Sequence, residues 1–329
     1  MEKNHDKLDA LLKFHIGISM DIQKNVKLCD KNWFKTGGVA RFYAEPINVH
    51  DVVAAALFAR EKKLAIFILG EGANILISDE GFDGLVIAPK NKQLIVDIAR
   101  ATITVGAGMS MPQLIRDALD LGLLGLEEFS GIPGTVGGSV FINIHYFEFL
   151  LSQFLIGATV VNLETGEIKK VDNAWFNFGY NQSTLQQAPW FLFDATFQLK
   201  LGAELETAYA RGRSHEIIRH RSRRYPKERT CGSFFRNFLA EEIPFMPGKE
   251  KVLFVAYYLD KVGVKGALRV GNAMVSHLHA NMLVTMEGAT SADVIALVRT
   301  MQEKLGAEFG ITPQPECQLI GFKEYPLHR

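Results

Sequence analysis

Short apolar runs separated by glycine dominate the chain from about residue 32 to residue 201. Their length and their content of β-branched and aromatic residues predict strands at 41–44, 65–69, 84–87, 101–105 and 158–161. Two segments, 49–62 and 111–121, have helical spacing instead, and Pro112 falls in a first turn, where proline is tolerated. This alternation predicts an α+β or α/β domain that ends near Leu201.

The pattern becomes more polar after Leu201. It predicts a helix that stops before Pro226 and, further on, another helix, a strand and a final helix, at 204–224, 252–262, 281–285 and 292–309. Ser291 is the expected N-cap of the final helix. We therefore expect a second, smaller α+β domain over 202–325, and a lead-in over 1–24 that begins with a short amphipathic helix.

Composition limits the kind of protein. The chain has 329 residues, of which 48% are hydrophobic, and this is enough for two domains with cores of their own. Its 36 basic and 36 acidic residues balance, so charge indicates neither a nucleic-acid nor a membrane partner. The N-terminus lacks signal-peptide character, and the three cysteines suggest neither a disulfide framework nor a zinc site. These features predict a soluble, cytoplasmic protein.

Two glycine-rich segments are the first candidates for chemistry. Residues 130–138, Ser-Gly-Ile-Pro-Gly-Thr-Val-Gly-Gly, form neither a helix interior nor a paired strand, but bare backbone N–H groups there can approach an anion. A tight surface turn is the alternative. Residues 70–76 follow a predicted strand, and Ile75 occupies the third glycine position of a dinucleotide fingerprint, which disfavours a Rossmann site. Two such loops favour a flavin held between two subdomains.

Both segments resemble the FAD-binding loops of the UDP-N-acetylenolpyruvoylglucosamine reductases, the MurB family of cell-wall synthesis. Ala73 stands where the family usually has serine, and residues 32–38 resemble its entry motif. The resemblance covers roughly residues 25–322 and is closest to the shorter type, which lacks an insertion between Tyr180 and Ser233. The FAD contacts that it implies are Gly70, Glu71, Gly72, Ala73, Asn74, Ile75, Ser130, Gly131, Ile132, Pro133, Gly134, Thr135, Gly137 and Gly138.

The resemblance also implies the architecture. A FAD-binding domain of the vanillyl-alcohol-oxidase/PCMH type, built from two α/β subdomains, is expected over 25–201. A MurB-type substrate domain is expected after it. The implied enzyme is an NADP-dependent UDP-N-acetylmuramate dehydrogenase, which reduces UDP-N-acetylglucosamine enolpyruvate with FAD and NADPH. We expect a monomer. The alternatives are a related flavoprotein with another acceptor, or a flavin-binding protein that has lost catalysis.

Reduction of a vinyl ether that carries a carboxylate needs a hydride donor, a proton donor and a group that handles negative charge. Residues 231–237 resemble the family's G-S-x-F-K-N motif, which implies that Ser233 donates the proton. Arg236 and Asn237 are then expected to contact the UDP portion, as part of a substrate site with Tyr180. Residues 311–321 resemble the terminal L-x-P-E-V motif, in which Glu316 would polarise the substrate carboxylate. An ordinary turn serine and an exposed glutamate are the alternatives.

Two segments depart from the family pattern, and both fall near the expected substrate. Asn181 stands where the family carries an arginine that holds the carboxylate. Residues 143–148 replace a segment rich in glycine and alanine, so either His145 supplies the missing charge or the substrate differs.

Two further patterns carry less weight. Residues 271–281 resemble a family signature, and His277 and His279 in it are weak evidence for a metal, so none is expected. The basic run 219–224 is best explained as a solvated helix end.

Overall fold

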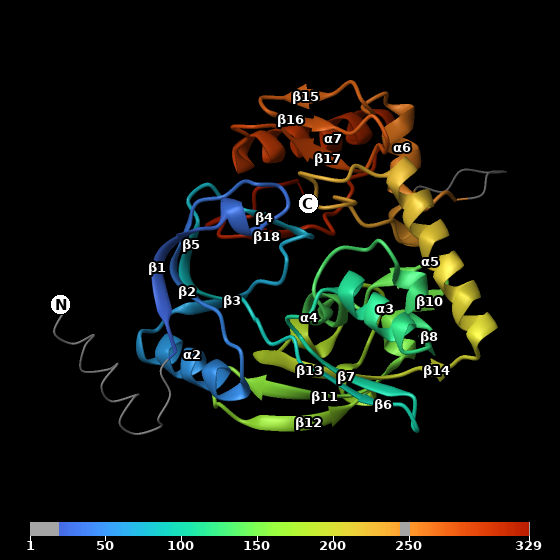
Figure 1. Cartoon of the computed structure of the whole chain (residues 1–329). Helices are drawn as coiled ribbons and strands as arrows, with labels where there is room; N and C mark the ends of the chain where they lie inside the picture. Colours follow the sequence, from blue (N-terminus) through green and yellow to red (C-terminus); the bar gives the residue numbers. More distant parts are fainter. Residues whose placement is uncertain (1–19, 244–250, 329) are drawn as a thin grey trace. The chain divides into compact units, whose positions relative to one another are not determined.

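Two units make up the described chain, which comprises residues 20–243 and 251–328 of a computed structural model (Figure 1). Unit 1 contains Arg41–Glu71 and Asp83–Ile218, together with the chain up to Asn25. Unit 2 contains Val26–Ala40, Gly72–Phe82 and the chain from Arg219 onward. Sheets and helices occur in both units, as the predicted α+β class requires. The amphipathic helix expected in the lead-in lies outside the described residues.

A five-stranded antiparallel sheet forms much of unit 1 (Figure 1). In sheet order its strands are β12 (Ile168–Asp172), β11 (Leu155–Asn162), β13 (Trp190–Gln198), β7 (Thr102–Gly106) and β6 (Leu94–Asp97). Helices α3 (Met111–Asp120) and α4 (Val136–Phe141) share one hydrophobic core with this sheet. The Ser110 side chain accepts a hydrogen bond from the Gln113 N–H and so caps α3, with proline in the first turn as predicted.

A second sheet has the strand order β1 (Ile22–Lys27), β2 (Val39–Ala44), β5 (Phe82–Ile87) and β3 (Ala65–Ile68), with β3 and β5 parallel. Helix α2 (Val49–Glu61) packs against it, and the Phe42 and Phe58 rings meet edge to face at 5.1 Å. The remaining elements of unit 1 are short: β8 (Leu123–Leu124), η2 (Leu126–Phe129), β9 (His145–Tyr146), β10 (Phe149–Leu150), η3 (Leu151–Gln153), η4 (Ala174–Phe176), η5 (Thr184–Gln186) and β14 (Lys200–Leu201).

Unit 2 has a three-stranded antiparallel sheet of β15 (Arg269–Val270), β16 (Ala273–Val275) and β17 (Leu283–Thr285). It shares a core with helices α6 (Val255–Lys261) and α7 (Ser291–Phe309). Strands β4 (Ile75–Ile77) and β18 (Gln318–Ile320) pair in parallel, and the turns η1 (Cys29–Lys31) and η6 (Ala240–Glu242) complete the unit. Helix α5 (Glu204–Arg224), yellow in Figure 1, has the predicted bounds and contains the unit boundary.

The predicted N-cap of α7 is wrong by one residue. Thr290 is the cap, because its Oγ1 accepts a hydrogen bond from the Asp293 N–H at 3.1 Å. Ser291 is the first helical residue, and its Oγ accepts instead from the N–H of Asp79 at 2.9 Å. In return the Asp79 carboxylate accepts from the N–H groups of Ser291 and Ala292, so a side chain from a distant segment completes this helix terminus.

Within residues 20–243 and 251–328, no helix has the length and apolar character needed to cross a membrane.

Candidate functional site

The glycine-rich segment 130–138 lies in unit 1 and leads into α4. Gly131 and Gly134 have φ angles of +75° and +126°, in the region that favours glycine. A Cβ placed on Gly134 would meet no atom within 4 Å, so the backbone is bare at this point. Ile132 and Pro133 are half-buried between the two glycines. This geometry leaves room for a ligand to approach the main chain.

Side chains fix this segment at both ends. Ser130 is buried, and its Oγ lies 2.7 Å from the Oγ of Ser214 on α5. Thr135 is the N-cap of α4, and its Oγ1 accepts a hydrogen bond from the Gly138 N–H at 3.2 Å. Gly137 and Gly138 form the first turn of that helix. The segment is therefore ordered, and it ends in the helix α4 rather than in a surface turn.

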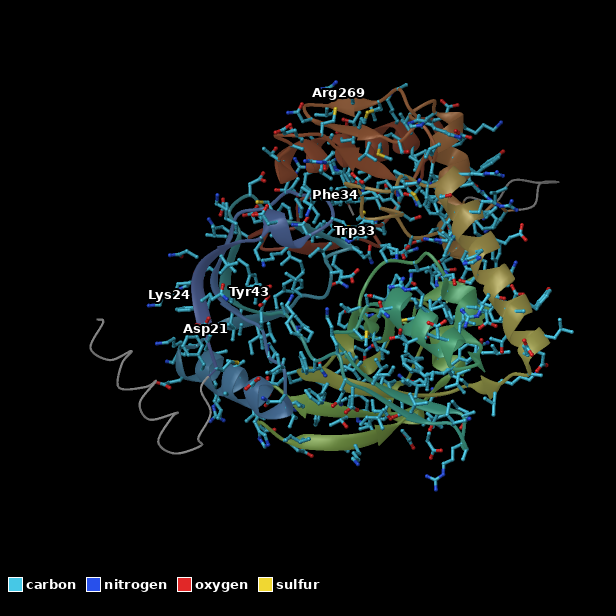
Figure 2. The ribbon with its side chains drawn as sticks, viewed as in Figure 1. Asp21, Lys24, Trp33, Phe34, Tyr43 and Arg269 are labelled. Atoms are coloured by element: carbon cyan, nitrogen blue, oxygen red, sulfur yellow. The ribbon has the colours of Figure 1, made fainter. Side chains whose placement is uncertain are left out.

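The second glycine segment, 70–75, crosses the unit boundary between Glu71 and Gly72. Gly72 has a φ of +67°, and a Cβ on it would lie 2.6 Å from the Cα of Asn32. The carbonyl of Gly72 accepts from the N–H of Trp33, which Figure 2 labels, at 3.0 Å. The backbone N–H groups of residues 71–74 donate to no acceptor in the described part of the chain. Available donors around a left-handed glycine suit a diphosphate, so these residues fit FAD.

In unit 2, Ser233 and Glu316 come together through Phe234. The Phe234 carbonyl accepts hydrogen bonds from the N–H of Glu316 at 2.8 Å and of Cys317 at 3.1 Å. The Glu316 carbonyl in turn accepts from Nδ2 of Asn74 at 3.4 Å. The strands that follow, β18 and β4, pair in parallel. Asn74 of the glycine segment, Glu316 and the segment that contains Ser233 are therefore neighbours in one unit.

Asn281 supports this arrangement, although the sequence did not assign it to the site. Its side-chain Oδ1 accepts from the N–H of Phe235 at 3.0 Å, and its Nδ2 donates to the Phe235 carbonyl at 2.7 Å. Its own carbonyl accepts from the N–H of Phe234 at 2.8 Å. Asn281 thus fixes the backbone on both sides of the residue that follows Ser233. Its place in the motif with two histidines was the available signal.

Glu316 is half-buried, beside the buried side chains of Phe234 and Cys317. Burial raises the pKa of Glu316 to about 7. A carboxyl group with a pKa of about 7 is about half neutral at pH 7, and the neutral form can donate a hydrogen bond to an anionic ligand. The alternative of an ordinary exposed glutamate is therefore wrong.

The Arg236 guanidinium forms an ion pair with Glu242 within unit 2. Its Nη1 and Nη2 donate to the two carboxylate oxygens of Glu242 at 2.8 and 2.6 Å, and Nη1 also donates to the Asn237 carbonyl at 3.0 Å. This fork holds the pKa of Glu242 below its usual value. No sequence pattern pointed to Glu242, which lies six residues further along the chain.

Tyr180 and Asn181 lie in unit 1 beside the atypical segment 143–148. The rings of Tyr180 and His145 are 4.9 Å apart, and Nδ2 of Asn143 donates to the Gly179 carbonyl at 3.1 Å. Asn181 has a φ of +55°. Burial lowers the pKa of His145 and so favours the neutral form of its imidazole.

The two histidines of unit 2 have separate environments. His279 accepts from the Asn281 N–H at 3.2 Å and packs edge-on against Tyr225, whereas His277 is exposed. Among the residues that the structure describes, no group of three or more His, Cys, Asp or Glu could hold a metal ion.

Unit 1 also contains a groove of about 720 Å³ with none of the predicted site residues in its walls. Two of the residues that line this groove, Lys200 and Glu206, form an ion pair with each other at 2.6 Å. The groove is separate from the predicted chemistry.

Comparison with known proteins assigns the chain to a family. Residues 40–172 match the FAD binding domain family, and residues 224–320 match the UDP-N-acetylenolpyruvoylglucosamine reductase C-terminal domain. The UDP-N-acetylenolpyruvoylglucosamine reductase of Trichormus variabilis is 31% identical over 319 residues, 97% of this chain and 92% of that protein. The chain belongs to the UDP-N-acetylenolpyruvoylglucosamine reductase family. A member from Synechococcus sp. is 34% identical over 93% of this chain and 96% of its own length.

The fold of this family member is confirmed by a solved structure. The UDP-N-acetylenolpyruvylglucosamine reductase (MurB) of Thermus caldophilus matches with a TM-score of 0.74 and 28% identity, over 92% of this chain and 100% of that one. The matched FAD binding domain contains both glycine segments, which confirms FAD as the cofactor class expected from the sequence. Ser233 and Glu316 both fall within the matched C-terminal domain.

Proposed function

We propose that this chain reduces UDP-N-acetylglucosamine enolpyruvate to UDP-N-acetylmuramate with NADPH, in the synthesis of peptidoglycan precursors. The observation that carries the proposal is the hydrogen bonding of the Ser233 and Glu316 segments through the Phe234 carbonyl, in a family member matched over nearly its whole length. The monomeric state and the cytoplasmic location stay predictions from the sequence.

Each residue has a role that its surroundings allow. The backbone N–H groups of residues 71–74 would bind the diphosphate of FAD. Residues 130–138 stay predicted FAD contacts, and most of their own N–H groups already donate within the protein. When bound, the flavin supplies hydride chemistry. The Ser233 hydroxyl would donate a proton to the carbon next to the reduced one. Neutral Glu316 would donate a hydrogen bond to the substrate carboxylate as negative charge develops there.

Anaerobic absorbance measurements test the function. Purified protein is expected to be yellow, to be bleached by NADPH, and to be re-oxidised by UDP-N-acetylglucosamine enolpyruvate. Bleaching without re-oxidation by this compound would instead indicate another acceptor. Absence of bleaching would indicate a flavin-binding protein without the activity.

Asn181→Arg is expected to raise kcat/KM for the carboxylate substrate by about tenfold or more, because a guanidinium forms charge-assisted, bidentate hydrogen bonds to a carboxylate. The left-handed backbone at position 181 is unfavourable for arginine and costs about 1–2 kcal/mol of stability. Steady-state kinetics and thermal unfolding measure the two effects. Gln182→Arg, at the next and exposed position, is the matched control. A folded Asn181→Arg protein without any gain would contradict this role.

Glu242→Ala is expected to raise KM for the UDP-sugar several-fold with little change in kcat. The reason is that Arg236 loses the carboxylate that orients its guanidinium for the UDP portion. The variant Glu241→Ala, one residue away and exposed, is expected to behave as wild type. A KM that stays the same in Glu242→Ala would show that the ion pair does not serve substrate binding.

A further inference from the structure

Glu71 makes a hydrogen bond that joins the two glycine segments. Its Oε2 accepts from the backbone N–H of Gly134 at 3.0 Å, and the two residues are 63 positions apart. Both belong to unit 1, and Glu71 is the last residue before the chain enters unit 2. A charged acceptor makes this bond stronger than one between neutral groups. The bond therefore fixes the point at which the segment 70–75 leaves unit 1.

Gly134 is hydrogen-bonded through both its carbonyl and its N–H. The Gly134 carbonyl accepts from the Met111 N–H at 2.9 Å, while its N–H is taken by Glu71. The φ of +126° at Gly134 is open to glycine alone among common residues, so a side chain here would disturb the position of this N–H. Gly134 is thus anchored to the start of α3 and to Glu71.

A second contact places the same two segments close together. A Cβ on Gly70 would lie only 2.7 Å from Oγ1 of Thr135. Thr135 in turn is fixed as the N-cap of α4. The pairs 70 with 135 and 71 with 134 therefore set the spacing of the two segments, one by packing and the other by a charge-assisted hydrogen bond.

We propose that Glu71 is a positioning residue for FAD, because its carboxylate joins residues 70–71 to residues 134–135 within unit 1, where both glycine segments are expected to contact the cofactor. The proposal rests on the FAD-dependent function above. The donor of unit 1 that needs positioning is the backbone N–H of Glu71 itself, which has no acceptor within the described residues. A negative side chain beside a diphosphate is unfavourable by itself. The hydrogen bond from the Gly134 N–H is the favourable interaction that this carboxylate makes in the structure.

Flavin release from the purified holoprotein tests the proposal. The protein is diluted, and the rise in FAD fluorescence gives the dissociation constant and the release rate. Glu71→Ala is expected to weaken FAD binding by about tenfold or more, the range for loss of a hydrogen bond to a charged group. Glu71→Gln keeps an oxygen acceptor for the Gly134 N–H and is expected to restore most of the affinity.

Glu127→Ala is the matched control. The Glu127 Oε2 accepts from the Gly125 N–H at 2.6 Å, so it is also a glutamate bonded to a glycine amide of unit 1, but outside both glycine segments. Its FAD affinity is expected to equal that of wild type. Thermal unfolding of each variant shows whether the fold is retained.

The outcomes separate this inference from the proposed function. Equal FAD affinity in wild type and Glu71→Ala overturns the positioning role. Tighter binding in Glu71→Ala also overturns it and shows that the carboxylate competes with the diphosphate. A wild-type protein that binds no FAD overturns the proposed function itself.

Discussion

Ser233→Ala is expected to lower turnover of UDP-N-acetylglucosamine enolpyruvate by about 10²- to 10⁴-fold, the usual contribution of a positioned general acid. The variant should still be bleached by NADPH, because that half of the cycle needs no proton from this hydroxyl. The backbone at position 233 is held by its bridge to Met282, and Phe234 beside it bonds to Asn281. Loss of one half-buried oxygen should therefore leave the fold intact.

Stopped-flow absorbance separates the two halves of the cycle for this variant. The rate of flavin bleaching by NADPH and the rate of re-oxidation by the enolpyruvyl substrate are measured independently. Ser222→Ala, in the last turns of α5, serves as the control because its hydroxyl bonds only to its own helix at Arg219. Turnover of Ser233→Ala within about threefold of wild type would exclude the proton-donor role, since general acids contribute far more than this.

The motifs in the sequence predict the residues of the candidate site, because the residues of one motif are close in sequence and can be recognised from their types and spacing alone. The glycine segments are local: left-handed φ angles at Gly72 and Gly134 follow from the absence of a Cβ. The strand and helix periods around them predicted the α+β fold for the same reason.

Partners that lie far apart in the sequence could not be predicted in this way. The hydrogen bond between Glu71 and Gly134 depends on how the two turns pack, and no local sequence pattern predicts it. The N-cap of α7 shows the same limit. Ser291 exchanges hydrogen bonds with the distant residue Asp79: the Asp79 N–H donates to the Ser291 Oγ, and the Ser291 N–H donates to the Asp79 carboxylate. The spacing of Arg236 and Glu242 matches no helical or strand period that would bring their side chains together.

The protonation state of Glu316 was also beyond sequence reasoning, because burial is a property of the folded chain. Its raised pKa, about 7, gives the largest pH effect that we expect in this protein. Below that value the neutral carboxyl can donate to the substrate carboxylate, and above it two negative groups would repel each other. We expect kcat/KM to fall as pH rises through about 7 in wild type.

Two substitutions at this position test the role in catalysis. Glu316→Ala is expected to lower turnover by about 10²- to 10³-fold, as for loss of one donor to a developing charge. Glu316→Gln keeps a neutral donor, so it should retain more activity and lose the decline near pH 7. A decline of the same size in Glu316→Gln would assign it to another group.

The same pKa makes a separate prediction for stability. Glu316 has an ordinary pKa of about 4.5 when unfolded and about 7 when folded, so the folded state holds an extra proton between these values. Raising the pH across this window should therefore lower the free energy of unfolding, by about 3 kcal/mol for a shift of this size. Urea unfolding at pH 5 and pH 8 should show most of this loss in wild type and not in Glu316→Gln. Glu287→Gln, an exposed glutamate of the same unit, should keep the wild-type dependence. Identical pH dependence in Glu316→Gln and wild type would mean that Glu316 is ionised in the folded protein, and the neutral-donor role would fail with it.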